Sequence, residues 1–399
     1  MEQNPLSRRV TSLAESQTIG MSKLSRELSA KGIDIVNLSL GEPDFVTPLH
    51  IREAAKKAID EGYTFYPPIS GYAELRKAIS AKFKRENNLD YAPDQVVVST
   101  GAKQSIANVV LCLVNPGDEV IIPLPYWVSY IEIVKLAEGI TVSISAGIES
   151  EFKITPAQLE AAITPKTKLF IFSSPCNPTG SVYTKAELKA LADVFAKHPG
   201  VFILSDEIYE HINFLDEHQS IAQFDFLKDR VIIVNGVSKG YAMTGWRIGY
   251  IGAPKFIADA CDKMQGQFTS AASSIAQKAA EAALTMDNHP TLEMKEAFLR
   301  RRNLVLGLMK DIPGIILNEP KGAFYLFPDV SSYFGKSDGE IKINNASDLC
   351  MYLLHKGHVS LVTGDAFGEP NCVRFSYAAA DEKVVEAVKR IRETLSLLK

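Results

Sequence analysis

The chain has 399 residues, of which 46% are hydrophobic and 23% charged, so its composition is that of a globular protein. Its length exceeds the roughly 250–300 residues at which a single core stops growing, and two domains are expected. The net charge of -4 gives no general attraction for polyanions, and no stretch approaches the roughly 18 apolar residues of a membrane span, so we expect neither a nucleic-acid nor a membrane partner.

The N-terminal part predicts an arm leading into a helix, a short strand, a turn, a second helix and a Pro-rich loop, at residues 1–32, 33–38, 40–45, 50–61 and 63–71. Residues 1–10 are polar and lack the apolar segment of a secretory signal. Ser22 is the predicted cap of the first helix. The turn carries Gly41 beside a proline, which exposes its backbone, and the rigid loop carries Tyr66.

Strands and helices then alternate to about residue 285, which predicts a mostly parallel sheet covered on both faces. Its strands are predicted at residues 96–99, 119–122, 169–172, 201–204 and 231–234. The first is followed by the turn Gly101-Ala102-Lys103 and a helix at 105–114, and a helix N-terminus after a glycine turn aims free amides at one point, which suits a phosphate. Because ligands collect at the carboxyl ends of strands, the polar groups after these strands should share one crevice.

The last of these strands delivers Lys239 to the edge of the sheet. An amine at such an edge can be desolvated, which lowers its pKa and makes it a nucleophile toward a carbonyl. Arg247 follows between Gly245 and Gly249, where missing side chains let a phosphate approach. A single lysine after a strand is more often a solvated surface residue, but a lysine combined with a phosphate site suggests pyridoxal phosphate as the cofactor.

The rest of the chain predicts two long helices and then shorter, mixed elements, namely helices at 270–286 and 291–310, a strand at 322–327, a helix from a Ser347 cap to Lys356, strands at 359–362 and 372–377, and a final helix from an Asp381 cap. We therefore expect an α/β fold with a large domain at 46–285, and a smaller α+β domain built from 1–45 and 286–399. The triple Arg300-Arg301-Arg302 is interpreted as the solvated face of a helix, and the seven histidines as surface residues.

Five cysteines are scattered along the chain, at positions 112, 176, 261, 350 and 372. Their odd number and the lack of any Cys-x-x-Cys pair argue for reduced thiols in a cytosol and against a zinc site. No other metal site is expected, and the predicted location is the cytoplasm.

Residues 236–249 resemble the lysine signature of class I/II aminotransferases over fourteen positions, Gly-Val-Ser-Lys, two residues, Ala-Met, one residue, then Gly-Trp-Arg-Ile-Gly. The resemblance extends over nearly the whole chain and is to the prokaryotic aspartate aminotransferase branch of the fold-type I pyridoxal-phosphate enzymes. It implies ping-pong amino transfer between an amino acid and a 2-oxo acid, most simply from aspartate to 2-oxoglutarate. It also implies a homodimer with shared active sites.

The resemblance assigns the cofactor contacts. Lys239 would carry pyridoxal 5'-phosphate and move the α-proton, Asp206 would keep the pyridine nitrogen protonated, and Tyr209 with Asn177 would hydrogen-bond the phenolic oxygen. The other contacts would come from Gly101, Ala102, Lys103, Trp127, Ser238, Arg247 and, from the neighbouring subunit, Tyr66. Gly236 departs from the serine of some relatives, so that phosphate contact is either absent or made by Ser238.

The substrate contacts follow from the same resemblance. Arg374 would bind the α-carboxylate, with Asn177, Trp127 and the turn at Gly41 helping. Lys103 and Ser16 would bind the distal carboxylate of a dicarboxylic substrate. Read without the resemblance, Arg374 in its apolar strand is more simply part of a structural ion pair, Asp206 a helix cap, and Trp127 a core residue.

Other functions stay open at this point. Prephenate or aromatic substrates could replace or accompany aspartate, and a pyridoxal-dependent carbon-sulfur lyase uses the same fold and core residues. A non-catalytic regulator on this scaffold would add a DNA-binding domain, for which we expect no residues to be left over.

Overall fold

The computed structural model describes residues 5–399 and contains a central seven-stranded sheet. Its strand order is β2-β8-β7-β6-β5-β3-β4, with bounds β2 Val96–Ser99, β3 Glu119–Pro123, β4 Ile140–Ile144, β5 Thr167–Ser173, β6 Phe202–Asp206, β7 Val231–Gly236 and β8 Gly249–Gly252. β8 runs antiparallel to the two strands beside it, β2 and β7, and the other pairs of this sheet are parallel. The predicted α/β fold with a mostly parallel sheet is confirmed, whereas β4 and the antiparallel β8 were not predicted.

Both faces of the sheet are buried. Along β7, Val231 and Ile233 belong to one core and Ile232 and Val234 to the other, and all four are fully buried. This explains why the strand is a continuous apolar run and does not alternate with polar residues. The first core is completed by helices α3 Leu49–Asp60, α4 Ala73–Asn87, α7 Pro156–Ala162, α8 Lys185–Lys197 and α10 Ser274–Thr285, and the second by α5 Ala102–Leu113, α6 Ser129–Leu136 and α9 Lys255–Phe268.

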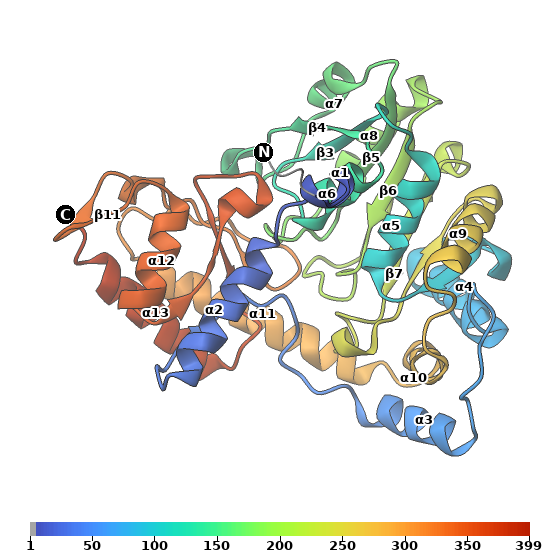
Figure 1. The fold of residues 1–399 in the computed structure, drawn as a ribbon, viewed down its shortest axis with the longest axis horizontal. Coiled ribbons are helices and arrows are strands. Elements are labelled where there is room, and N and C mark those ends of the chain that lie inside the picture. Colours follow the sequence, from blue (N-terminus) through green and yellow to red (C-terminus); the bar gives the residue numbers. More distant parts are fainter. Residues whose placement is uncertain (1–4) are drawn as a thin grey trace.

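A second group of elements lies beside the sheet and is reached by the long helix α11, coloured orange in Figure 1. It comprises α2 Gln17–Ala30, β1 Val36–Asn37, α11 His289–Met309, β9 Tyr325–Leu326, β10 Ser337–Asp338, β11 Ile341–Lys342, α12 Ala346–Lys356, β12 Val359–Ser360, β13 Val362–Thr363, β14 Val373–Ser376 and α13 Asp381–Leu395. β1 pairs in parallel with β12, so the N-terminal segment completes this group. The short helix α1 Arg8–Thr11 lies instead near α6 (Figure 1).

Several predicted boundaries were wrong. Ser22 is a buried residue inside α2, which begins five residues earlier at Gln17. α12 is capped by Asn345, whose Oδ1 accepts the Asp348 amide at 2.8 Å. Asp381 is the first residue of α13, after Ala380 at the cap position. The strand predicted at 322–327 is reduced to β9, because the Ala323 amide instead donates to the Ile212 carbonyl at 2.7 Å.

The arginine triple is not a solvated face. The side chain of Arg300 is 62% exposed, but those of Arg301 and Arg302 are only 8% and 13% exposed. Successive residues of a helix point about 100° apart, so three adjacent arginines cannot all face the same way. Among the described residues no helix combines the length and the apolar character needed to cross a bilayer.

Candidate active site

One cavity of about 250 Å³ lies at the carboxyl edge of the central strands and is also lined by residues of the second group. It brings together most of the predicted site residues, namely Ser16, Gly41, Ala102, Lys103, Trp127, Asn177, Asp206, Tyr209, Ser238, Lys239, Arg247 and Arg374. The expectation that strand ends share one crevice is thus met. Gly101 and Tyr66 do not line this cavity.

Lys239 projects its amine into the cavity and donates a hydrogen bond to the carbonyl oxygen of Gly41. Burial lowers the pKa of Lys239 to about 8, although the carboxylate of Glu42 acts in the opposite direction. The nearby guanidinium groups of Arg374 and Arg247 lower the pKa further. A lysine with such a pKa is partly neutral near pH 8 and can act as a nucleophile or a base.

Asp206 ends β6 with its carboxylate buried. Its Oδ2 accepts the Tyr130 hydroxyl at 2.7 Å and its Oδ1 accepts the Ile208 amide at 3.2 Å. Burial nevertheless raises the pKa of Asp206 to about 6. A buried carboxylate in a cavity favours a cationic partner, so this residue fits a protonated ring nitrogen.

Two tyrosines of the site were missed by sequence reasoning. Tyr130 lies three residues after Trp127, and their rings meet edge to face with centroids 5.4 Å apart, a spacing that could have drawn attention to it. The hydroxyl of Tyr325 lies 2.8 Å from that of Tyr209, and nothing in the local pattern around Tyr325 indicates this contact. Burial raises the pKa of Tyr209, so this hydroxyl remains protonated and can donate a hydrogen bond at neutral pH.

The end of β2 and the start of α5 form a cradle that requires glycine. Gly101 has φ +83°, and a Cβ there would lie 2.0 Å from Nη2 of Arg247. A Cβ on Gly249 would lie 2.1 Å from the amide nitrogen of Ala102. The first amides of α5 and the Arg247 guanidinium therefore lie close together, as a phosphate requires.

Gly236 pairs with Gly249 across β7 and β8, and a Cβ at position 236 would lie 2.8 Å from the Ile248 carbonyl oxygen. This backbone has no room for the serine of some relatives. Ser238 lines the cavity instead.

Arg374 is 2% exposed. Its Nη1 donates to Asn177 Oδ1 at 2.9 Å and its Nη2 to the Ser39 carbonyl at 2.7 Å, while Nε has no hydrogen-bond partner among the described residues. The guanidinium also lies 4.6 Å from the centroid of the Tyr325 ring. Among residues 5–399 no carboxylate lies within 4.0 Å of Arg374 to form an ion pair. A buried cation without an anionic partner is costly, and this geometry fits an anionic ligand better than a structural ion pair.

Lys103 and Ser16 reach the same cavity from different directions. The Lys103 ammonium lies 5.0 Å from the centroid of the Trp127 ring, and desolvation together with the nearby Arg247 lowers the pKa of Lys103. Ser16 stands at the N-terminus of α2, and its hydroxyl lies 3.5 Å from that of Thr18. The cavity is thus lined by four cationic side chains, namely Lys103, Lys239, Arg247 and Arg374.

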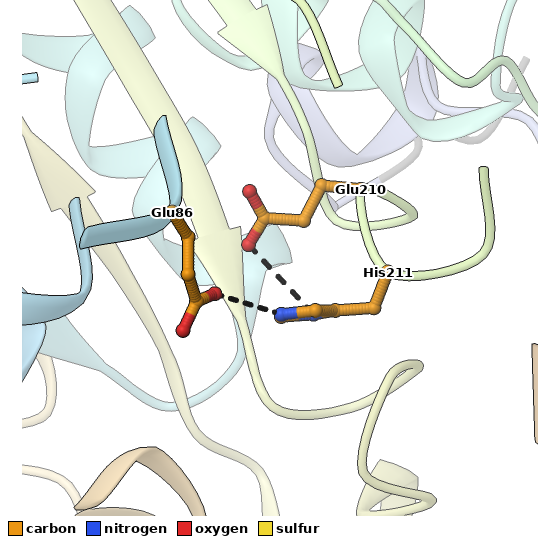
Figure 2. Close-up of side chains that lie close together, drawn as sticks. All are labelled: Glu86, Glu210 and His211. Atoms are coloured by element: carbon orange, nitrogen blue, oxygen red, sulfur yellow. Dashed lines mark hydrogen bonds and ion pairs between the residues drawn. The ribbon is translucent and has the colours of Figure 1, made fainter. Parts of the chain in front are cut away.

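A cluster of charged residues lies outside the cavity (Figure 2). His211 Nε2 is 3.0 Å from a Glu86 oxygen and its Nδ1 is 3.7 Å from a Glu210 oxygen. The fully buried ammonium of Lys82 contacts Glu210 and compensates its negative charge. A metal ion is therefore not needed to compensate this carboxylate.

The prediction that all histidines are surface residues is therefore wrong. The side chain of His218 is only 8% exposed and lies 2.9 Å from Glu207, and that of His211 is 19% exposed. His211 contacts Glu86 of α4, which is 125 residues away in the sequence, whereas His218 contacts Glu207 of its own segment.

Comparison with known proteins gives a consistent picture. The family described as "Aminotransferase class I and II" matches residues 33–391. The chain is 50% identical over 380 residues to the "Aspartate/prephenate aminotransferase" of Cereibacter sphaeroides, covering 94% of this chain and 95% of that protein. The crystal structure of the aspartate aminotransferase from Rhizobium meliloti superposes with a TM-score of 0.96 at 41% identity and full coverage of both chains. The aspartate aminotransferase from Thermus thermophilus with maleate superposes with a TM-score of 0.92 at 38% identity, covering 98% of this chain and all of that one.

Proposed function

The chain belongs to the class I and II aminotransferases, and from that premise we propose that it transfers the amino group of aspartate to 2-oxoglutarate. It is a pyridoxal-phosphate-dependent enzyme acting on amino and 2-oxo acids. The observation that carries the choice of substrate is the pair of separate cations in one cavity, the unpaired buried Arg374 and Lys103. The other two cations of the cavity, Lys239 and Arg247, are assigned to the cofactor below, so Arg374 and Lys103 are left for a substrate with two carboxylates.

We infer that the residues around the cavity divide the work of holding the cofactor. Lys239 would carry it covalently and move the α-proton, and Asp206 would accept a hydrogen bond from its protonated ring nitrogen. Tyr209 and Asn177 would donate to its phenolic oxygen, and Trp127 would flank its ring. Its phosphate would be held by the backbone amides of Gly101, Ala102 and Lys103 and by the side chains of Ser238 and Arg247. When bound, pyridoxal phosphate supplies an electron sink that lets the substrate α-carbon lose its proton.

The substrate is oriented by its carboxylates. Arg374 takes the α-carboxylate with its free Nε, helped by Asn177, Trp127 and the backbone at Gly41. Lys103 and Ser16 take the distal carboxylate. The Thermus thermophilus relative was solved with maleate, which is a dicarboxylate, and this supports the assignment. The Cereibacter sphaeroides relative is named for prephenate as well as aspartate, so prephenate is the second candidate acceptor.

A half-reaction screen tests the proposal. The loaded enzyme is mixed with each amino acid in turn, and the loss of the bound cofactor's absorbance is followed. We expect aspartate and glutamate to discharge the cofactor much faster than alanine or phenylalanine, because only they engage both cations. Equal rates for all amino acids would contradict the dicarboxylate proposal, and release of pyruvate and ammonia from cystathionine would point to a lyase.

We propose that the active enzyme is a homodimer in which Tyr66 completes the neighbouring site. Tyr66 is 97% exposed in the single chain and lies outside its own cavity. Phe65, Val46 and Leu49 are also exposed on the same part of the chain. A monomer rarely leaves several large apolar side chains of one segment in water, whereas a subunit interface would cover them.

Subunit mixing should reveal the shared site. Lys239→Ala and Tyr66→Phe chains should each be impaired alone, but a hybrid dimer has one site with both native residues. We therefore expect mixed subunits to recover activity relative to either parent. The measurement is transamination after exchange proven by native mass spectrometry, and exchange without recovery would contradict the proposal.

We further propose that residues 46–285 act as the cofactor-binding domain and that 1–45 and 286–399 form the smaller domain. A cytoplasmic location is proposed as well. It is supported by the five cysteines, all of which are free thiols.

A further inference from the structure

The turn that covers the Lys239 amine is tied to the rest of the protein at several points. The Gly41 carbonyl oxygen accepts from Lys239, and Glu42 accepts from the Thr244 hydroxyl at 3.1 Å. The Ser39 carbonyl, just before the turn, accepts from Arg374. These three contacts secure the first half of the turn, and its second half is secured by a residue for which the catalytic proposal has no role.

That residue is Arg301, on helix α11. Its Nη1 donates to Asp44 Oδ1 at 2.7 Å and its Nε to Asp381 Oδ1 at 3.1 Å. The guanidinium also lies 5.3 Å from the centroid of the Phe45 ring and 5.8 Å from that of Phe298. Arg301 is buried, so its planar fork is held against the turn by two carboxylates and two rings at once.

The neighbouring Arg300 provides an internal contrast. It donates to both oxygens of Asp381, at 3.1 and 3.0 Å, but it is exposed, and within residues 5–399 its side chain hydrogen-bonds to Asp381 alone. Two adjacent arginines on one helix thus share a carboxylate partner, but only Arg301 reaches the turn.

From these contacts we propose that Arg301 is a positioning residue that, through Asp44, holds the Gly41 carbonyl against the amine of Lys239. Gly41 lies only three residues from Asp44, so we expect release of Asp44 to loosen the backbone at Gly41, although the contacts of Ser39 and Glu42 remain. The backbone at Gly41 is tightly packed, since a Cβ on Gly41 would lie 2.8 Å from the Tyr325 hydroxyl. The inference rests on the proposed role of Lys239 as the reactive lysine.

The environment of Lys239 supplies a readout that does not depend on turnover. The charged groups that act on its amine are Glu42, Arg374, Arg247 and Asp206, but burial is the largest influence and lowers the pKa of Lys239. If the turn loosens, water reaches the amine and this influence weakens. The pKa of Lys239 should then rise toward the ordinary value for lysine.

The test titrates the Lys239 amine in the full chain after removal of the cofactor. The rate of acetylation by acetic anhydride is measured against pH, with peptide mass spectrometry resolving Lys239, and the midpoint of the curve is compared between variants. We expect Arg301→Met to raise the midpoint by roughly half a pH unit or more. Arg300→Met is the matched control and should leave it unchanged. The midpoint, unlike the absolute rate, is insensitive to a simple change in access.

Asp44→Asn is the second variant, for the case that Arg301→Met folds poorly. It removes the same ion pair, but Asp44 is more exposed than Arg301, so its substitution disturbs the core less. It should shift the midpoint in the same direction, and the double variant should be no worse than either single one, since the two residues act as one contact. In the loaded enzyme both variants should lower kcat/KM by roughly tenfold, as expected when a reactive group is misplaced.

A midpoint in Arg301→Met and Asp44→Asn equal to that in Arg300→Met would overturn the proposal. Its failure is distinguishable from that of the proposed function. If a lysine other than Lys239 carries the cofactor, peptide mapping of the reduced enzyme finds the label on that other lysine. The titration of the Lys239 amine still responds to Arg301 in that case.

Discussion

Lys239→Ala is expected to lower kcat for transamination by at least about 10⁴-fold, because it removes both the covalent attachment and the base that moves the α-proton. The variant should still bind pyridoxal phosphate without a covalent bond, since the cradle at Gly101 and Arg247 and the carboxylate of Asp206 are untouched. Steady-state rates and equilibrium binding of the cofactor measure the two effects separately.

Chemical trapping identifies the lysine directly. Borohydride reduction of the loaded native enzyme followed by peptide mapping should place the pyridoxyl mass on Lys239. Lys255→Ala serves as the control variant, because Lys255 is exposed and pairs with Asp259 on α9. It should keep full activity and full labelling of Lys239. A label on Lys103 or Lys255 would refute the assignment.

Lys103→Ala is expected to lower kcat/KM for aspartate and glutamate on the order of 10²-fold, while alanine changes little. The reason is that one charge-assisted contact to the distal carboxylate is lost, which is roughly 2 to 3 kcal/mol. A monocarboxylic substrate never makes that contact. The measurement is kcat/KM for aspartate, glutamate and alanine with the same preparation of enzyme.

Lys103→Met separates charge from packing. Methionine keeps an aliphatic side chain against the Trp127 ring but removes the ammonium that lies 5.0 Å from it. If the charge binds the substrate, the methionine variant should lose as much activity toward aspartate as the alanine variant does. Equal losses for aspartate and alanine in either variant would instead mean that Lys103 serves the cofactor or the fold.

Much of the large sheet and its site could be predicted from the sequence, because the relevant information is local. The run Val231 to Val234 is apolar at every position, which fits a strand buried on both faces, and all four side chains are indeed buried. Because parallel strands end at the same edge, Asp206 and the lysine turn could be expected to share one crevice. The lysine signature itself lies within a single continuous stretch, and two of its glycines, Gly236 and Gly249, are required by close backbone approaches at the sheet edge.

The tertiary structure alone decided which distant groups meet. Arg374 and Asn177 are 197 residues apart, and Arg301 and Asp44 are 257 residues apart. A strand or helix pattern depends on side chains two to four positions away, so it tells which residues face inward but not what they face. The arginine triple and the histidines were misjudged for this reason. Whether a charged side chain on a helix or a loop is solvated or buried depends on the segment packed against it. Here the contacting residues are distant in the sequence, as Glu86 is from His211 and Asp44 is from Arg301.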